Sequence, residues 1–412
     1  MNTQNPRAGK RRRPFGQGFK ALPVRRGSLL LVLLALLAVQ GTVLVRHSKG
    51  VAATSWMNVY GPSDFASLRA VADYLCGLKI PIPPVVSVFE IVSTRLTGSA
   101  AWVTVAGYRT ALVAGFLLSL AWAATSRARL LAAFVLAEIF LAGTVVVHPG
   151  NAQVYDVFFP ALVLVHVGLL KGAASPALPS AAAGTASVFS GIALAMVDLM
   201  RPFAIVLLPV FLVGAVAQLR PLGRMRLWLL LLPVLCLSGG WHAHLFLRHG
   251  QLVASNHSGF NLSHAWEMVE EPELVDEVND EPVQPWRWAN LNTEEHAENS
   301  RRWRRAIVFY AVRHPLQSVL HVGRRFVAIA AAPTAIREHK PSHPILPIYR
   351  MAATGSLALL VGQVGLVVVF AATAGRQIGR VLAVPDHALA VVTLLAVVIL
   401  AVGDTGEETR FL

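Results

Sequence analysis

Charged side chains are scarce in this 412-residue chain. They make up 14% of the residues, whereas 55% are hydrophobic. A soluble domain of this length carries about 25% charged residues. Apolar runs long enough to cross a hydrocarbon layer of ~30 Å recur along the sequence. The chain is therefore expected to be an integral membrane protein with several spans.

Cysteine is rare in the chain, which has only two. Cys76 and Cys236 lie far apart and match no ligand spacing, which excludes a disulfide framework or a cysteine-based metal site. The first apolar run, residues 29–45, follows a basic head but offers no small-residue cleavage site. We interpret this run as an uncleaved first membrane helix.

The net charge of +14 does not form a stripe that would suit nucleic acid. Lys and Arg stand instead in short clusters beside the apolar runs, which is the pattern that the positive-inside rule produces. The expected environment is therefore membrane lipid, and nucleic acid is not an expected partner.

The fold expected from these runs is an all-α membrane helix bundle with about nine spans. The spans are residues 29–45, 105–124, 130–147, 157–170, 186–200, 203–219, 227–246, 351–374 and 387–402. With the head in the cytoplasm, the five cytoplasmic segments hold sixteen Lys and Arg but one acid, Asp386. This asymmetry predicts a multi-pass protein of the inner or plasma membrane, with its N-terminus inside and its C-terminus outside.

Four regions follow from this topology. They are a basic cytoplasmic head (1–28), a membrane bundle that includes an outer loop at 46–104 (29–247), an extracytoplasmic loop region (248–350), and C-terminal membrane helices with an outer tail (351–412).

The two outer segments are expected to form a small helical part. In the first, apolar residues follow Ser63-Asp64 at helical spacing and predict an interfacial helix. In the second segment, the stretch from Glu267 to Glu298 contains half of the acidic residues of the chain. The pattern of residues 301–336 then predicts one or two basic amphipathic helices, interrupted at His314-Pro315. Residues 341–347 predict an extended lead into the eighth span.

Several individually weak landmarks stand in a consistent order. They are Tyr60-Gly61-Pro62-Ser63-Asp64, Pro81-Ile82-Pro83-Pro84, His148-Pro149-Gly150-Asn151, Met200-Arg201-Pro202-Phe203, Ser258-Gly259-Phe260-Asn261-Leu262 and Glu407-Glu408-Thr409-Arg410-Phe411. In this order they resemble the bacterial branch of the GT-C membrane glycosyltransferases, the superfamily of protein O-mannosyltransferases and lipid A aminoarabinose transferases. The family often pairs two acids in the first loop, and here Ser63 stands beside Asp64.

The resemblance implies an inverting glycosyltransferase that uses a polyprenyl-phosphate-linked sugar on the outer face. The acceptor would be an envelope lipid, polysaccharide or protein. Asp64 would be the catalytic carboxylate that deprotonates the acceptor hydroxyl, although it also suits the N-cap of the helix that follows. Arg201, Lys79 and Arg69 would bind the donor phosphate, with anchoring of a proline-broken turn as the alternative for Arg201. Asp198 is expected to neutralise Arg201.

Asp156 is a candidate ligand for a divalent cation, Mg²⁺ or Mn²⁺, and its alternative role is to cap the fourth span. His148, Glu407 and Arg410 are candidate supporting residues, and the last two would otherwise form an ordinary ion pair. If the chain is such a transferase, the Asp64 and Asp156 carboxylates should lie within roughly 12 Å of each other.

Other classes remain open. Charged residues inside spans, Glu138 and Arg109, would suit a transporter, flippase or assembly scaffold. The absence of a visible internal repeat weakens the transporter interpretation. An inactive GT-C relative that binds polyprenyl phosphate would suit Ser63 beside Asp64. The tryptophans from Trp266 to Trp303 are candidates for stacking on a sugar. The alternative is that the acids among them only make the loop soluble.

Overall fold

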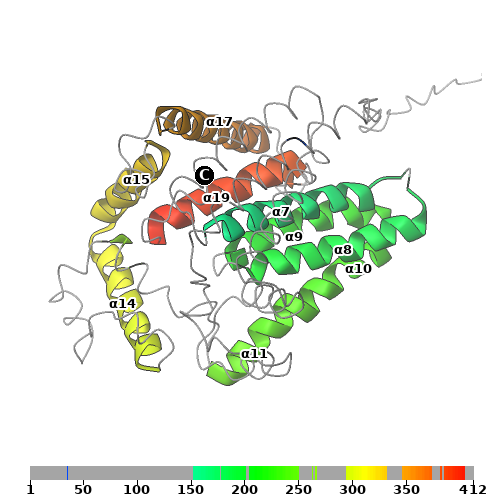
Figure 1. The fold of residues 1–412 in the computed structure, drawn as a ribbon, viewed down its shortest axis with the longest axis horizontal. Coiled ribbons are helices and arrows are strands. Elements are labelled where there is room, and N and C mark those ends of the chain that lie inside the picture. Colours follow the sequence, from blue (N-terminus) through cyan, green and yellow to red (C-terminus); the bar gives the residue numbers. More distant parts are fainter. Residues whose placement is uncertain are drawn as a thin grey trace, which may run out of the picture.

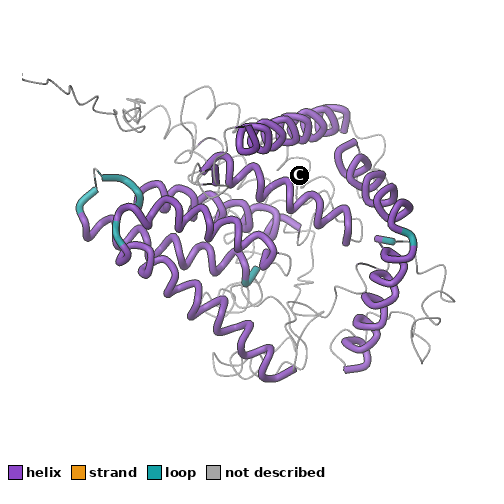
Figure 2. The backbone as a smooth tube through the Cα atoms, turned by 180° about the vertical axis from the view of Figure 1, so that it is seen from behind, coloured by secondary structure: helices purple, strands orange, loops and turns teal. Residues whose placement is uncertain are grey.

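The structure is a computed structural model and describes part of the chain. The described residues are 35, 152–176, 178–200, 204–249, 262, 265–266, 294–331, 346–373, 381–382 and 385–403. Within them every regular element is a helix, as the backbone view in Figure 2 shows. The first three expected spans and the outer loop at 46–104 lie outside the described residues, apart from Ala35.

Four consecutive helices form the centre of the fold (Figure 1). They are α7 (Ala152–Ala173), α8 (Ser180–Asp198), α9 (Ala204–Leu219) and α10 (Arg224–Val234). Short connections join them, so that neighbours along the chain run antiparallel. Their shared core is apolar and consists of Val163, Val167, Leu194, Val197, Ala204, Leu207, Phe211 and Val234, together with Val392 and Ala396.

The helix that starts as α10 continues through a π-helical segment, Leu235–Gly239, into α11 (Gly240–His249). Pro233 lies just before this segment and cannot donate the hydrogen bond that the preceding turn would need. The wider π turn follows directly and changes the helical register at this point. The three pieces together form one long, nearly apolar helix.

Four further helices complete the described part. α19 (Pro385–Gly403) packs on α9, and α17 (Leu346–Thr373) and α15 (Pro315–Ala331) pack on α19. α14 (Glu294–Arg313) meets α15 at His314. A Cβ on Gly214 of α9 would lie 3.8 Å from the Cβ of Ala388, so α19 starts beside the second half of α9 and ends near the start of α9.

Among the described residues, three helices are long and apolar enough to cross a membrane: Ser180–Asp198, Ala204–Leu222 and Arg224–Leu247. Shorter apolar stretches occupy Ala161–Ala173, Leu357–Val369 and His387–Ile399. These six segments coincide with the last six expected spans. Large apolar side chains on their outer faces, such as Leu232, Leu359 and Leu366, are exposed, as expected for helices that face lipid. The prediction of a helical membrane protein therefore holds for this part of the chain, whereas the count of nine spans remains a prediction.

Two predicted boundaries were wrong. The helix of the fourth span starts at Ala152, not at 157, so Asp156 lies in the second turn of α7 and is not its cap. α17 already starts at Leu346, so Pro347 belongs to its first turn rather than to an extended lead. Proline is well tolerated there, because the first N–H groups of a helix have no intrahelical acceptor. The predicted break at His314-Pro315 is confirmed, since α14 ends at Arg313 and α15 starts at Pro315.

Basic side chains gather at the end of the bundle where α7 turns into α8 and α9 turns into α10. Lys171 stands in the last turn of α7, and Arg220, Arg224 and Arg226 surround the second turn. The Arg226 Nη1 donates a hydrogen bond of 2.9 Å to the carbonyl oxygen of Ala173 and so ties the two turns together. Asp198, at the end of α8, marks the opposite end of the bundle.

This distribution leads to a prediction about orientation. A reporter fused after Gly223 is expected to report the cytoplasm, because Lys and Arg next to spans are retained on that side. Fusions after Glu298 and after Leu412 are expected to report the outer side. Alkaline phosphatase and green fluorescent protein fusions would measure both compartments. A cytoplasmic Glu298 would contradict the expected topology.

Candidate functional site

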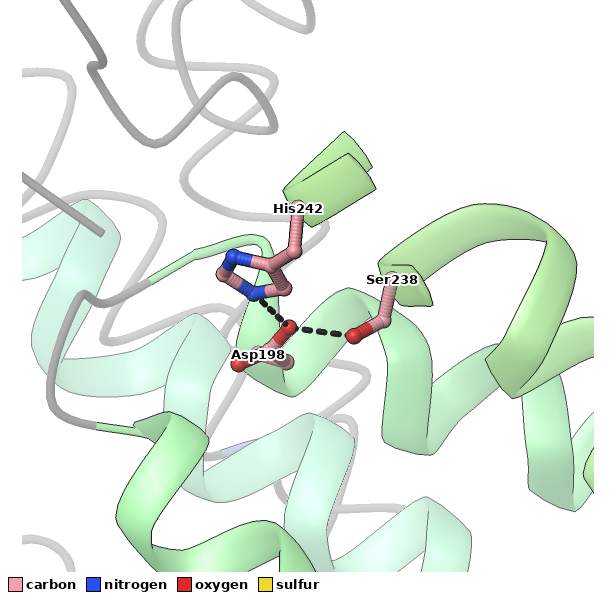
Figure 3. A network of polar contacts seen from close by, with 3 residues as sticks. All are labelled: Asp198, Ser238 and His242. Carbon is pink, nitrogen blue, oxygen red and sulfur yellow. Dashed lines mark hydrogen bonds and ion pairs between the residues drawn. The ribbon is translucent and has the colours of Figure 1, made fainter. Parts of the chain in front are cut away.

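Three polar side chains meet at the end of α8 (Figure 3). Asp198 is the last residue of α8 and is 4% exposed. Its Oδ2 accepts a hydrogen bond of 2.5 Å from the Ser238 hydroxyl and one of 2.8 Å from His242 Nε2. Ser238 belongs to the π-helical segment and His242 to α11. The network therefore joins two neighbouring membrane helices.

Close packing between α8 and α10 brings these residues together. A Cβ on Gly191 would lie 2.1 Å from the carbonyl oxygen of Leu230, so the two backbones approach each other as only glycine permits. Asp198 follows Gly191 by seven residues, which places both on the same side of α8. Ser238 and His242 are four residues apart and share a side of their own helix. The glycine contact thus aligns the seam in which the network lies.

The second carboxylate oxygen of Asp198, Oδ1, can still accept a hydrogen bond. Among the described residues, Oδ1 is buried and has no hydrogen-bond partner. Buried carboxylate oxygens normally have one, so this atom can accept a proton or a donor from a bound molecule. Arg201, three residues after Asp198, lies outside the described residues.

The arrangement differs from a Ser–His–Asp catalytic triad. In such a triad the serine hydroxyl donates to the imidazole, whereas the Ser238 hydroxyl donates to Asp198. Ser238 is therefore not activated as a nucleophile.

The imidazole and the carboxylate form a pair that can handle protons or anions. His242 Nε2 faces a carboxylate oxygen, which fixes the proton on that nitrogen, and Nδ1 points away from Asp198 (Figure 3). Nδ1 can then accept a proton as a base. Once protonated, the ring is a cation balanced by Asp198 and can donate from Nδ1 to a phosphate oxygen.

A second buried polar pair lies deeper between α7 and α8. His166 Nδ1 is 3.0 Å from both the carbonyl oxygen and the hydroxyl of Ser190, and that hydroxyl also donates to the His166 carbonyl. The ring meets the side chain of Phe211 edge-on at 5.2 Å. Hydrogen bonds of this kind hold membrane helices together, so we interpret this pair as structural.

Most of the residues expected at the site lie outside the described residues. They are Asp64, Arg69, Lys79, His148, Arg201, Glu407 and Arg410. Asp156 lies in α7, but its side chain is not described. The expected convergence of Asp64, Asp156 and Arg201 in one cavity therefore remains a prediction.

The divalent cation also remains a prediction. The described residues contain no group of three or more His, Cys, Asp or Glu side chains that could hold a metal ion. The expected ligand, Asp156, is not among the side chains that this search covers.

The structure bears on two expectations about individual side chains and changes one of them. Asp198 was expected to neutralise Arg201, which lies outside the described residues, so that pairing remains a prediction; the partners that the structure describes are Ser238 and His242. Trp303 was a candidate for stacking on a sugar and is instead buried against Ala306 and Ile307.

Trp266 is likewise part of the packing. Its ring stacks on His321 at 5.1 Å, and its Nε1 donates to the carbonyl oxygen of Val402 at 2.8 Å. The hydrogen bond from Trp266 therefore connects this residue of the loop region to the end of α19.

His242 was not expected at the site. Its only sequence signal is that it stands near the end of the apolar run at 227–246, while Asp198 stands near the end of the run at 186–200.

Comparisons with protein-family models, with curated proteins and with solved structures give no match. The GT-C resemblance therefore stays a hypothesis that depends on the order of its motifs.

Proposed function

We propose that this protein is a GT-C-like glycosyltransferase of the plasma membrane. It would move a sugar from a polyprenyl-phosphate donor to a lipid, polysaccharide or protein of the cell envelope on the outer face. The observation that supports this proposal best is the Asp198–His242 pair. It lies at the end of α8, three residues before Arg201 and at the end of the bundle where α19 also ends.

A lipid-phosphate donor needs positive charge at the membrane boundary. Charge at this depth is costly unless opposite charges compensate it. A protonated His242 beside Asp198 fulfils that condition, because the carboxylate balances the imidazolium when no donor is bound. When a donor phosphate approaches, His242 Nδ1 and Arg201 would both donate to its oxygens.

The proposed reaction is a single displacement. The acceptor hydroxyl oxygen attacks the anomeric carbon, the bond from that carbon to the phosphate oxygen breaks, and the configuration inverts. Asp64 takes the hydroxyl proton. The lipid phosphate leaves with the bonding electron pair, and Arg201, His242, Lys79 and Arg69 stabilise its charge. Asp156 would hold a divalent cation, and none of the reaction steps above requires that cation.

A second candidate function is a non-enzymatic transporter or flippase. The Asp198–His242 pair between two membrane helices favours it, because ionisable groups inside spans often mark a transport path. A scaffold, or an inactive relative that binds polyprenyl phosphate, would use the same outer site without turnover.

The test is a comparison of cell-envelope glycans. In a deletion strain, the wild-type gene should restore the missing glycan, and Asp64→Asn should not. Loss of a general base typically lowers a rate by roughly 10²–10⁴-fold, and the unused polyprenyl-phosphate sugar should accumulate. Mass spectrometry of the glycan and of the lipid fraction would measure both.

Glu298→Gln serves as the control, since Glu298 forms an exposed ion pair with Arg302 and its loss should change little. If Asp64→Asn restores the glycan fully, Asp64 is not the base, and the transporter or scaffold becomes the better explanation.

A further inference from the structure

An exposed apolar stripe runs along α15 and continues onto the end of α14. Its members are Val308, Val312, Leu316, Val319, Leu320 and Val327. They recur at intervals of mostly three or four residues, which keeps them on one side of a helix. Val312 is 75% exposed and Leu316 is 71% exposed. Contiguous apolar surface of this kind usually marks a contact with a partner or a membrane.

The stripe is continuous across the joint between the two helices. Pro315 has no N–H to donate, but the bonds on both sides of it are kept. His314 N donates to the Tyr310 carbonyl oxygen at 2.8 Å, and Ser318 N donates to the His314 carbonyl oxygen at 2.9 Å. These bonds carry the helical register past the proline, so the apolar sides of α14 and α15 stay aligned.

The side of α15 next to the stripe packs against helices of the membrane bundle. Val322 and Phe326 contact the cluster of Val397 and Ala401 near the end of α19. Arg325 Nε donates to the Ala401 carbonyl oxygen at 2.8 Å. α14 and α15 extend along the end of the bundle where α19 terminates, steeply inclined to α19 (Figure 1). Because α19 is one of the apolar helices, its end lies at the membrane boundary, and α15 lies there with it.

Arginines border the stripe. Arg301 and Arg305 continue the exposed side of α14 ahead of Val308, and Arg324 flanks the stripe on α15, seven residues after the exposed Gln317. α15 thus has a packed side, an apolar exposed side and a polar side. A helix with these features lies in the plane of the interface, with its apolar side among acyl chains and its basic groups among anionic headgroups.

We propose that α15 and the end of α14 form a lipid-binding surface for anionic phospholipid in the adjoining leaflet. The stripe from Val308 to Val327 enters the acyl-chain region, and Arg301, Arg305 and Arg324 contact the phosphate groups. Charge complementarity and the position at the end of α19 favour lipid over a protein partner. This surface does not depend on the proposed sugar transfer.

The first test measures what covers the stripe. The full-length protein, with Cys76 and Cys236 replaced by Ser, carries a spin label at Val319→Cys or at Gln317→Cys in nanodiscs that contain anionic lipid. The label at 319 is expected to collide more with oxygen than with a water-soluble nickel chelate, and the label at 317 should show the reverse. A label at 319 that prefers nickel, or that neither reagent reaches because protein covers it, would overturn the proposal.

The second test measures the preference for anionic lipid. A fluorophore at Val319→Cys is quenched by brominated anionic or brominated zwitterionic lipid at equal mole fraction. Arginines near an anionic surface enrich anionic lipid, and we expect roughly twofold to fivefold stronger quenching by that lipid. The triple variant R301Q/R305Q/R324Q should lose the difference, while Arg220→Gln, at the other end of the bundle, should keep it. Equal quenching of the wild-type protein by both lipids would contradict the proposal.

Discussion

Replacement of His242 by glutamine is expected to lower the rate of sugar transfer by roughly 10²–10³-fold. Glutamine keeps an N–H donor for Asp198 Oδ2, which His242 now contacts at 2.8 Å, so the helices should stay paired. It cannot carry a positive charge, and the donor phosphate would lose a cation at the end of α8. The measurement is product formation by the purified protein in nanodiscs with a polyprenyl-phosphate sugar.

His244→Gln is the matched control. His244 is two residues further along α11, and its ring lies against Trp241 at a centroid distance of 5.9 Å. Its replacement should leave the rate within about twofold, since it does not contact Asp198.

Thermal unfolding shows whether a lower transfer rate in the His242→Gln variant reflects a change in catalysis or a loss of folded protein. The glutamine variant at His242 should unfold near the wild-type temperature. An unchanged transfer rate in that variant would make the Asp198–His242 pair structural, and the leaving phosphate would then depend on Arg201, Lys79 and Arg69 alone.

The helices of the described part could be predicted from the sequence because each membrane helix has to satisfy its own backbone hydrogen bonds. Long apolar runs are the direct result, and the last six expected spans all coincide with apolar helices. The break at His314-Pro315 followed from proline chemistry in the same way. The boundary of α7 was missed because the polar residues Gln153 and Asp156 interrupt the apolar run, yet they continue the helix beyond the hydrophobic segment.

The polar network could not be predicted, because it depends on contacts between helices. Asp198 has a positive residue three positions later, and the local rule for helical pairs therefore favoured Arg201. Its observed partners are forty and forty-four positions away. They reach it because α10 approaches α8 closely at Gly191, which no local pattern reveals. Trp303 was similarly judged by its chemistry, and only the fold shows that Ala306 and Ile307 pack around it.

Gly191→Ala is expected to cause the largest loss of stability among single methyl additions at the described glycines. The new Cβ would lie 2.1 Å from the Leu230 carbonyl oxygen and 3.2 Å from the Leu230 Cα. Both atoms belong to the backbone, so no side chain can rotate away, and α8 and α10 must separate. Overpacking of this kind costs about 1–3 kcal/mol, occasionally more.

The chain provides a graded set of controls. A Cβ on Gly184 of α8 would meet only the Cδ1 of Leu229, at 3.3 Å, which is the mobile end of a side chain. Gly184→Ala should therefore cost far less than Gly191→Ala. A Cβ on Gly362 of α17 has no neighbour within 4 Å. Gly362→Ala should leave stability unchanged or raise it by up to about 1 kcal/mol, because alanine has the higher helix propensity.

Thermal unfolding in detergent would rank the three variants, with Gly191→Ala lowest, Gly184→Ala intermediate and Gly362→Ala highest. Since the same seam aligns Asp198 with Ser238 and His242, Gly191→Ala should also lower sugar transfer in the fraction that remains folded. The Gly362→Ala variant should keep the wild-type rate. If Gly191→Ala unfolds at the wild-type temperature, α8 and α10 are not in backbone contact, and the alignment of Asp198 with His242 needs another cause.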